Sequence, residues 1–222
     1  MSSTQFQDTS IFVEEPANDP MFTARALIAL NTLNTVEVGR ELFRLIKEAC
    51  SGLGLGPGLL AKRVYIERSI TTCTAVPTTD TRSAFRARLH EPGQGQILVA
   101  HAYQRTTQRG IGCSGIVRWN PSDIVPGSGR QRPSYIALAH ELIHCLHYVT
   151  GGCYRAPMVT FDFTQDSGLA EEEARTVGLY PYDNEPLSEN AFRRAFNLPL
   201  RTEYAPGIDL SHVQSFAPPA SD

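Results

Sequence analysis

Two histidines and a glutamate lie close together in His140-Glu141-Leu142-Ile143-His144. On a helix, residues four apart share one face, so His140 and His144 can offer two imidazoles to one metal ion. Glu141 would then lie beside the ion, where it could hold a water molecule rather than act as a ligand. This pattern is typical of zinc-dependent peptide hydrolysis, in which zinc lowers the pKa of its water toward ~7 and the glutamate accepts the proton. The alternative is a pair of histidines that only pack in a core.

The residues around this motif predict a buried helix from about 135 to 151. Pro133 and Ser134 favour a helix start, because proline is tolerated near a helix N-terminus. Gly151 and Gly152 provide the glycines that commonly end a helix. Apolar residues surround nearly the whole circumference, which is typical of a central buried helix; they are Ile136, Leu138, Ala139, Leu142, Ile143, Leu146 and Val149.

Two histidines leave zinc short of a third protein ligand. His147 lies ~10 Å along a straight helix from His140, so we expect it to pack or to support a ligand rather than to bind the same ion. His212 is a second candidate, but it falls in a tail that we expect to be weakly ordered. The third candidate is the run Glu171 to Glu173 on another predicted helix. Consecutive helical residues point ~100° apart, so one glutamate should reach the metal while a neighbour could hydrogen-bond a histidine.

The remaining sequence predicts an α+β domain in which a small mixed or antiparallel sheet packs on the central helix. Polar residues 1–19 predict a disordered arm, 20–206 a single metallopeptidase domain, and 207–222 a loose tail. An exposed edge of the sheet could bind an extended peptide by strand addition. Hydrophobic periodicity predicts helices over 22–33, 38–49, 169–178 and 189–196 (with Ser188 as N-cap), strands over 64–66, 85–89, 97–102 and 116–119, and an extended segment over 199–204.

Composition excludes several classes of protein. The chain of 222 residues carries a net charge of −3, which gives no footprint for nucleic acid. It contains neither an apolar run of the ~20 residues that a membrane helix needs nor a signal peptide. Its five cysteines form no CxxC pair and predict reduced thiols of a cytosolic setting, with a bond between Cys145 and Cys153 left open.

Three spaced motifs resemble the zinc site of the clostridial neurotoxin light chains. The segment from His140 to His147 is similar to their zinc helix, including a histidine that is not a ligand. The segment from Glu172 to Gly178 resembles their Glu-Glu-x-x-Thr-x-Gly stretch, whose second glutamate ligates zinc and maps to Glu173. Arg201-x-x-Tyr204 resembles the pair that helps to stabilise the oxyanion in those toxins.

A broader resemblance is to the NleD/HopH (XopG) group of bacterial type III secreted effector proteases. It covers about Ser114 to Tyr204 and includes the segment from Ser188 to Arg193. The resemblance implies a zincin-like fold and a Zn²⁺ endopeptidase with His140, His144 and Glu173 as ligands and Glu141 as the catalytic base. It implies that Arg201 or Tyr204 stabilises the oxyanion.

The same resemblance implies virulence by secretion into the host cell cytoplasm and cleavage of a host signalling protein to suppress immunity. NleD-type members cut MAP kinases within the activation loop, so a MAP kinase is one candidate substrate. The polar first ten residues are compatible with a type III secretion signal, and a secretion chaperone is a candidate partner.

Two alternatives stay open at this point. One is a zinc peptidase whose third ligand is a histidine, for which His212 is the candidate. The other is a non-catalytic effector that binds a host protein and uses a structural zinc. Structural sites usually fill all four positions with protein ligands, and the sequence offers no obvious fourth ligand. Beyond the motif match, the sequence does not decide whether Glu172 or Glu173 binds the metal.

Overall fold

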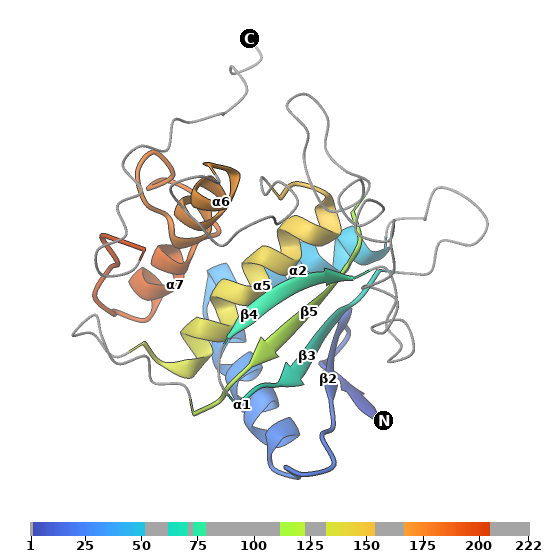
Figure 1. Ribbon diagram of the computed structural model, residues 1–222. Helices are drawn as coiled ribbons and strands as arrows, with labels where there is room; N and C mark the ends of the chain where they lie inside the picture. Colours follow the sequence, from blue (N-terminus) through green and yellow to red (C-terminus); the bar gives the residue numbers. More distant parts are fainter. Residues whose placement is uncertain are drawn as a thin grey trace.

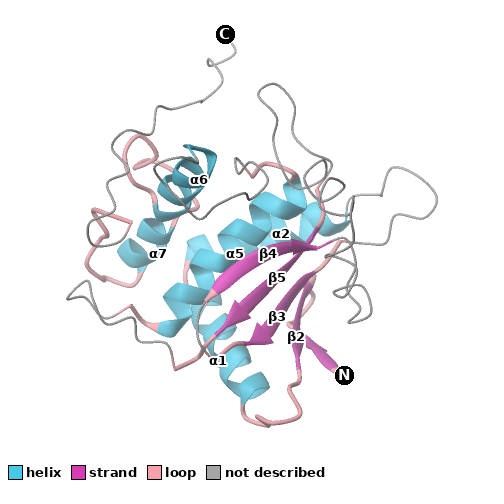
Figure 2. Ribbon diagram, in the orientation of Figure 1, coloured by secondary structure: helices cyan, strands magenta, loops and turns pink. Residues whose placement is uncertain are grey.

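The computed structural model describes residues 2–51, 62–70, 73–78, 112–122, 132–153 and 167–204. These residues form a mixed α+β fold, as the sequence predicts, with one sheet and helices packed on it (Figures 1 and 2). The strands are β1 (Ser3–Gln5), β2 (Ile11–Glu14), β3 (Val64–Arg68), β4 (Thr74–Thr78) and β5 (Ser114–Trp119). The helices are α1 (Phe22–Asn34), α2 (Glu37–Ser51), α5 (Ser134–Thr150), α6 (Ser167–Val177) and α7 (Glu189–Ala195).

The sheet is mixed, with strand order β1-β2-β3-β5-β4. Strand β3 pairs in parallel with β2 and with β5, while β1 and β4 are antiparallel to their neighbours. Helices α1 and α5 pack on the sheet and α2 packs on both of them, so the three lie on one face (Figure 1). Helices α6 and α7 contact α5 and lie to the left of it in Figure 1, away from the sheet.

Helix α5 is the centre of the fold, and every residue from Ile136 to Val149 is buried. Strand β5 fixes both ends of the helix. The indole Nε1 of Trp119 donates to the carbonyl of Ser134 at 2.9 Å, and the backbone N–H of Cys113 donates to the carbonyl of Tyr148 at 3.0 Å. The same carbonyl also accepts from the N–H of Gly151 at 3.1 Å, so the cap and the residue before β5 both bind the last turn of the helix. Gly151, with φ of 68°, ends the helix in the left-handed conformation that the sequence predicts for a glycine there.

A glycine allows β5 to approach α5 closely. A Cβ atom on Gly115 would lie 2.6 Å from the Sγ atom of Cys145, which follows directly after His144. Real side chains do not approach so closely, so any larger residue at position 115 must push the helix or the cysteine away. The distance between the sheet and the helix that carries the two histidines therefore depends on this glycine.

Helices α6 and α7 meet end to end through their caps. Ser188 is the N-cap of α7, as predicted, and its Oγ accepts a hydrogen bond from the N–H of Ala191 at 3.2 Å. Gly178 follows α6 with φ of +79°, and a Cβ there would lie 2.6 Å from the Oγ of Ser188. The side-chain amide of Asn190 donates to the carbonyl of Gly178 at 3.1 Å and to that of Arg201 at 2.9 Å. These contacts join α6, α7 and the segment that follows α7.

The predicted disordered arm over residues 1–19 is wrong for most of its length. Strands β1 and β2 extend the sheet, and Phe6, Ile11 and Val13 are buried. Buried and partly exposed side chains alternate in β2, but this alternation is too short to stand out in a polar segment. Besides β1, this strand pairs with β3, about fifty residues further along the chain, and no local pattern announces that second pairing.

The other predicted elements agree in most places. The helices and the strands at 64–66 and 116–119 are confirmed, but strand β4 was not predicted because Pro77 interrupts its pattern. Proline is tolerated there because β4 lies at the edge of the described sheet. The five cysteines form no disulfide with one another, so the bond between Cys145 and Cys153 that the sequence left open is not formed. The predicted strands at 85–89 and 97–102, the tail 207–222 and His212 lie outside the described residues.

Within the described part, no helix has both the length and the apolar composition needed to cross a membrane.

We expect Gly115→Ala to lower the free energy of unfolding by roughly 1–3 kcal/mol, because the added methyl group overpacks the contact with Cys145. Urea titration of both proteins measures the change. In a Cys145→Ala background the same substitution should cost clearly less, since the Sγ atom is gone. Equal costs in the two backgrounds would show that this contact does not set the distance between β5 and α5.

Candidate metal centre

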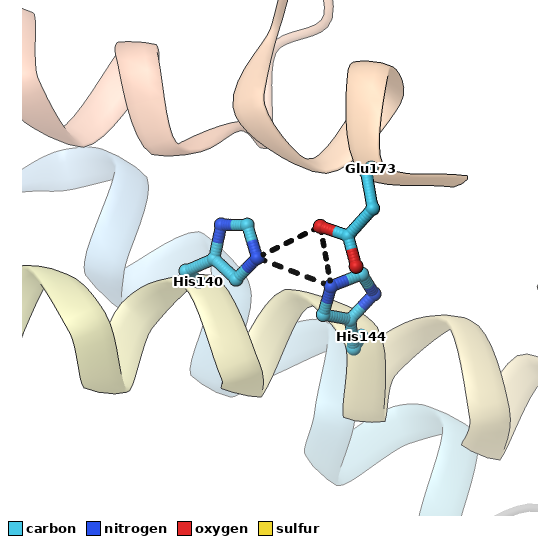
Figure 3. Close-up of side chains that lie close together, drawn as sticks. All are labelled: His140, His144 and Glu173. Carbon is cyan, nitrogen blue, oxygen red and sulfur yellow. Dashed lines mark hydrogen bonds and ion pairs between the residues drawn. The ribbon is translucent and has the colours of Figure 1, made fainter. Parts of the chain in front are cut away.

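Three ligand atoms from two helices converge on one point (Figure 3). The Nε2 atoms of His140 and His144 on α5 lie 3.2 Å apart. The Oε2 atom of Glu173 on α6 lies 3.2 Å from the first nitrogen and 3.5 Å from the second. The two side chains on α5 point to one side of the helix, and Glu173 reaches them from the neighbouring helix (Figure 3). The structure thus brings together the three residues that the sequence predicts as ligands.

The spacing of these atoms fits a zinc ion. Ligands ~2.0–2.1 Å from a tetrahedral zinc ion lie roughly 3.3–3.5 Å from each other, which agrees with the three observed separations. The Oε2 atom of Glu173 is buried and has no hydrogen-bond donor among the described residues. A buried carboxylate oxygen without a partner costs free energy unless a cation balances it. The residues present therefore fit a bound Zn²⁺ ion.

Each histidine is held from behind by a buried carboxylate. The Nδ1 atom of His140 lies 3.0 Å from Oε2 of Glu189, and the Nδ1 atom of His144 lies 2.9 Å from Oε1 of Glu172. A carboxylate oxygen can only accept, so both Nδ1 atoms carry hydrogen and donate. Both Nε2 atoms then present lone pairs toward Glu173. Proteins usually orient a metal-binding imidazole in this way: a carboxylate accepts a hydrogen bond from one ring nitrogen while the other ring nitrogen binds the metal.

The pKa values of the clustered side chains also favour a bound cation. Burial alone would lower the pKa of His140 and of His144, but the neighbouring carboxylates outweigh it and raise the pKa of both above the usual value. The histidines in turn hold the pKa of Glu173 below its usual range, although burial acts in the opposite direction. The cluster therefore stabilises positive charge at this point, and a divalent cation can take the place of protons.

Glu189 has no exposed surface and lies among arginines. Arg193 donates to its Oε1 atom at 2.7 Å, and Arg201 donates to its Oε2 atom at 2.7 Å. The NH1 atom of Arg132 lies 3.9 Å from the same Oε2 atom. Burial would raise the pKa of Glu189, but the hydrogen bond with His140 and the charges of Arg201 and Arg132 hold it below its usual range. A guanidinium-bound carboxylate keeps its charge when it is buried, so Glu189 remains an acceptor for His140.

The structure places the predicted oxyanion pair in two different settings. The guanidinium of Arg201 binds Glu189, and its Cζ atom lies 5.5 Å from the ring centroid of Tyr204. Burial, together with the nearby carboxylates of Glu173 and Glu141, raises the pKa of the Tyr204 phenol. The phenol therefore keeps its proton and can donate it in a hydrogen bond. Glu141 is buried, with 6% of its surface exposed, beside His140 on α5.

The three consecutive glutamates have three different partners. The hydroxyl of Tyr182 donates to Glu171, Glu172 accepts from His144, and Glu173 faces both Nε2 atoms. Glu172 also lies 2.5 Å from Nδ1 of His147, so these residues form a second cluster of atoms that could hold a cation. Hydrogen bonds already join both Nδ1 atoms to Oε1 of Glu172, whereas Oε2 of Glu173 has no hydrogen-bond donor among the described residues. The cluster at Glu173 is therefore the better metal site.

Glu189 and Asn190 are site residues that the sequence reasoning missed. The segment Ser188-Glu189-Asn190 predicts a helix start and forms part of the resemblance to the effector group, but neither observation assigns it to the metal site. A buried acidic residue in the first turn of a short helix can serve the helix dipole or a partner elsewhere. Only the packing of α7 on α5 shows that Glu189 meets His140.

The chain is similar to one protein family and to several solved structures. The model of the Peptidase M91 family, described as "Effector protein", matches residues 9–204. The light chain of Clostridium botulinum neurotoxin serotype F is 15% identical and has a TM-score of 0.49, with 85% of this chain and 59% of that chain covered. The type G light chain is 16% identical with a TM-score of 0.46, covering 90% and 60%. This chain thus spans about three fifths of the length of these light chains. No curated protein matches.

The geometry predicts different effects for the three glutamates on zinc affinity. We expect Glu173→Gln to weaken zinc binding by more than about 100-fold and Glu172→Gln by about 10–100-fold, because the second acts only through His144. Glu171→Gln is the matched control and should leave the affinity unchanged, since Glu171 bonds to Tyr182. Competition with a chromophoric chelator measures all three. A larger loss from Glu172→Gln than from Glu173→Gln would reverse the assignment of the ligand.

Proposed function

We propose that this chain, which belongs to the Peptidase M91 effector family, is a zinc-dependent endopeptidase that hydrolyses a peptide bond in a host protein. One observation carries the proposal. The lone pairs of two imidazoles and one carboxylate oxygen face a single point at separations of 3.2 to 3.5 Å. A divalent cation between them would satisfy all three acceptors at once. His140, His144 and Glu173 are the proposed ligands.

Three protein ligands leave one position for a water molecule or a substrate. A zinc ion held by these residues would supply Lewis-acid chemistry, which polarises a scissile carbonyl and lowers the pKa of bound water toward neutral pH. Structural zinc sites, in contrast, usually fill the fourth position with a protein group. Cys145 is the nearest sulfur in sequence, but its Sγ atom faces Gly115 on the sheet side of α5. This orientation favours the catalytic proposal over a structural zinc in a binding protein.

The chain's own residues would move the protons and stabilise the charge. Glu141 lies beside His140 and is the proposed base, which takes the proton of the attacking water and delivers it to the leaving amine. We assign the oxyanion donor to Tyr204, whose pKa is raised by burial and by the charges of Glu173 and Glu141. Arg201 binds Glu189 and contacts the Tyr204 ring, so its proposed role is to hold both residues in place.

An extended substrate could reach the site along β4. This strand is the last in the described sheet and runs antiparallel to β5. The hydroxyl of Tyr148 on α5 donates to the carbonyl of Ala75 at 3.4 Å, so β4 lies against the helix that carries the proposed ligands. A peptide that adds to β4 as a further strand would therefore run beside α5.

The finer parts of the proposal concern the host. The family description as an effector supports delivery into a host cell, and we propose type III secretion into the host cytoplasm. A host signalling protein is the proposed substrate, with a MAP kinase as the first candidate to test. A secretion chaperone would be a further partner before delivery.

A survey of new protein termini in a eukaryotic cell lysate tests the proposal. The purified chain should create new termini that are absent after its metal is removed with a chelator and that return when zinc is added. The peptides on either side of each terminus identify the bond and the substrate. A protein with stoichiometric zinc that creates no new terminus in lysates from several hosts would contradict the proposed endopeptidase activity.

We expect Glu141→Ala and Glu141→Gln to abolish the new termini, because Glu141 is the proposed acceptor of the water's proton. Zinc content and the thermal unfolding temperature should stay close to those of the parent protein. Metal analysis and differential scanning fluorimetry provide these controls. If either variant lost its zinc, Glu141 would have to be reassigned as a ligand.

Tyr204→Phe should lower kcat for the identified substrate by about 100- to 1,000-fold, the loss that follows removal of one oxyanion donor. KM and zinc affinity should change little, because the ring and its contact with Arg201 remain. Steady-state kinetics on a peptide that spans the cut bond separate the two constants. A change confined to KM would instead indicate that the hydroxyl binds the substrate in its ground state.

A further inference from the structure

His147 is a buried polar residue of α5 for which the proposed mechanism has no role. Only 4% of its surface is exposed, and it lies one turn beyond His144. Its Nδ1 atom is 2.5 Å from Oε1 of Glu172 on α6. A short hydrogen bond between two buried side chains on different helices indicates more than packing.

The same oxygen atom of Glu172 serves both histidines. Oε1 lies 2.9 Å from Nδ1 of His144 and 2.5 Å from Nδ1 of His147. Because a carboxylate oxygen accepts only, each imidazole donates its Nδ1 hydrogen to it. Two donors from successive turns of α5 therefore hold this oxygen from two directions.

A competing acceptor makes the position of Glu172 important for His144. The Oγ1 atom of Thr176 lies 3.3 Å from Nδ1 of His144. If the carboxylate moved away, the imidazole could donate to this hydroxyl instead. A neutral hydroxyl is a weaker acceptor than a carboxylate and makes the imidazole a weaker metal ligand.

We infer that His147 is a positioning residue of the proposed zinc site: its Nδ1–H holds the Glu172 carboxylate against His144, so that His144 directs Nε2 at the metal. This inference rests on the proposed zinc site and adds a residue that touches neither the metal nor the substrate. His147 strengthens zinc binding through Glu172.

Three substitutions separate a hydrogen-bonding role from simple packing. In His147→Asn the side-chain amide nitrogen takes the place of Nδ1 and can still donate to Glu172. In His147→Gln the amide reaches the place of Nε2 on the far side of the ring, and in His147→Leu the donor is absent. We expect the asparagine variant to stay within about threefold of the parent zinc affinity. The other two should lose about 10-fold or more, as is usual for groups that orient a metal ligand.

The experiment measures the dissociation constant for zinc alone by chelator competition on the full chain. Thermal unfolding of the metal-free proteins is recorded beside it. Equal losses of affinity in all three variants, or a parent-like affinity in His147→Leu, would overturn the inference. If the parent chain bound no zinc, the inference and the proposed function would both fall. Zinc binding by the parent without any proteolysis would contradict the proposed endopeptidase only.

A double-mutant cycle provides a readout that a structural role would not change. In a Glu172→Leu background there is no carboxylate to hold, so His147→Leu should cause no further loss of zinc affinity. Additive losses would contradict an action through Glu172. Should His147→Leu fail to fold, His147→Gln carries the same test, because it keeps a polar side chain of similar size.

Discussion

The burial of several carboxylates beside two imidazoles is the constraint on which the rest of this structure depends. Glu172 and Glu189 are almost completely buried, and Glu173 is largely so. A carboxylate removed from water is strongly unfavourable unless hydrogen bonds and opposite charges surround it. Glu172 meets two imidazoles and Glu189 meets an imidazole and guanidinium groups. Glu173 has an oxygen without a donor among the described residues, and this is the place that a cation would fill.

Helix α5 lies between the sheet and the two helices that carry these carboxylates. Strand β5 holds both ends of the helix, and Gly115 lets the sheet approach it. The opposite side of α5 is then covered by α6, which carries Glu172 and Glu173, and by α7, which carries Glu189 (Figure 1). Two features hold these short helices together: Gly178 closely approaches Ser188, and Asn190 donates hydrogen bonds to the segments after both helices. The acidic residues thus stand on elements that are fixed to one another as well as to α5.

Local patterns in the sequence predicted what depends on local physics. The spacing of His140 and His144 placed two imidazoles on one helical face, and Gly151 marked the helix end that the structure shows. Contacts between distant segments could not be predicted in this way. Strand β2 becomes a strand by pairing with β3, and Glu189 becomes part of the site by packing of α7 on α5. The order of Glu172 and Glu173 around the histidines depends on the rotation of α6, which the sequence predicted only by resemblance.

The crystal structure of the zinc-loaded chain, with anomalous scattering recorded at the zinc absorption edge, tests the central claim most directly. We predict one strong anomalous peak within about 2.0–2.2 Å of Nε2 of His140, Nε2 of His144 and Oε2 of Glu173, with a fourth position that no protein atom occupies. A peak between His147 and Glu172 instead, or a zinc ion with four protein ligands, would contradict the proposed catalytic site.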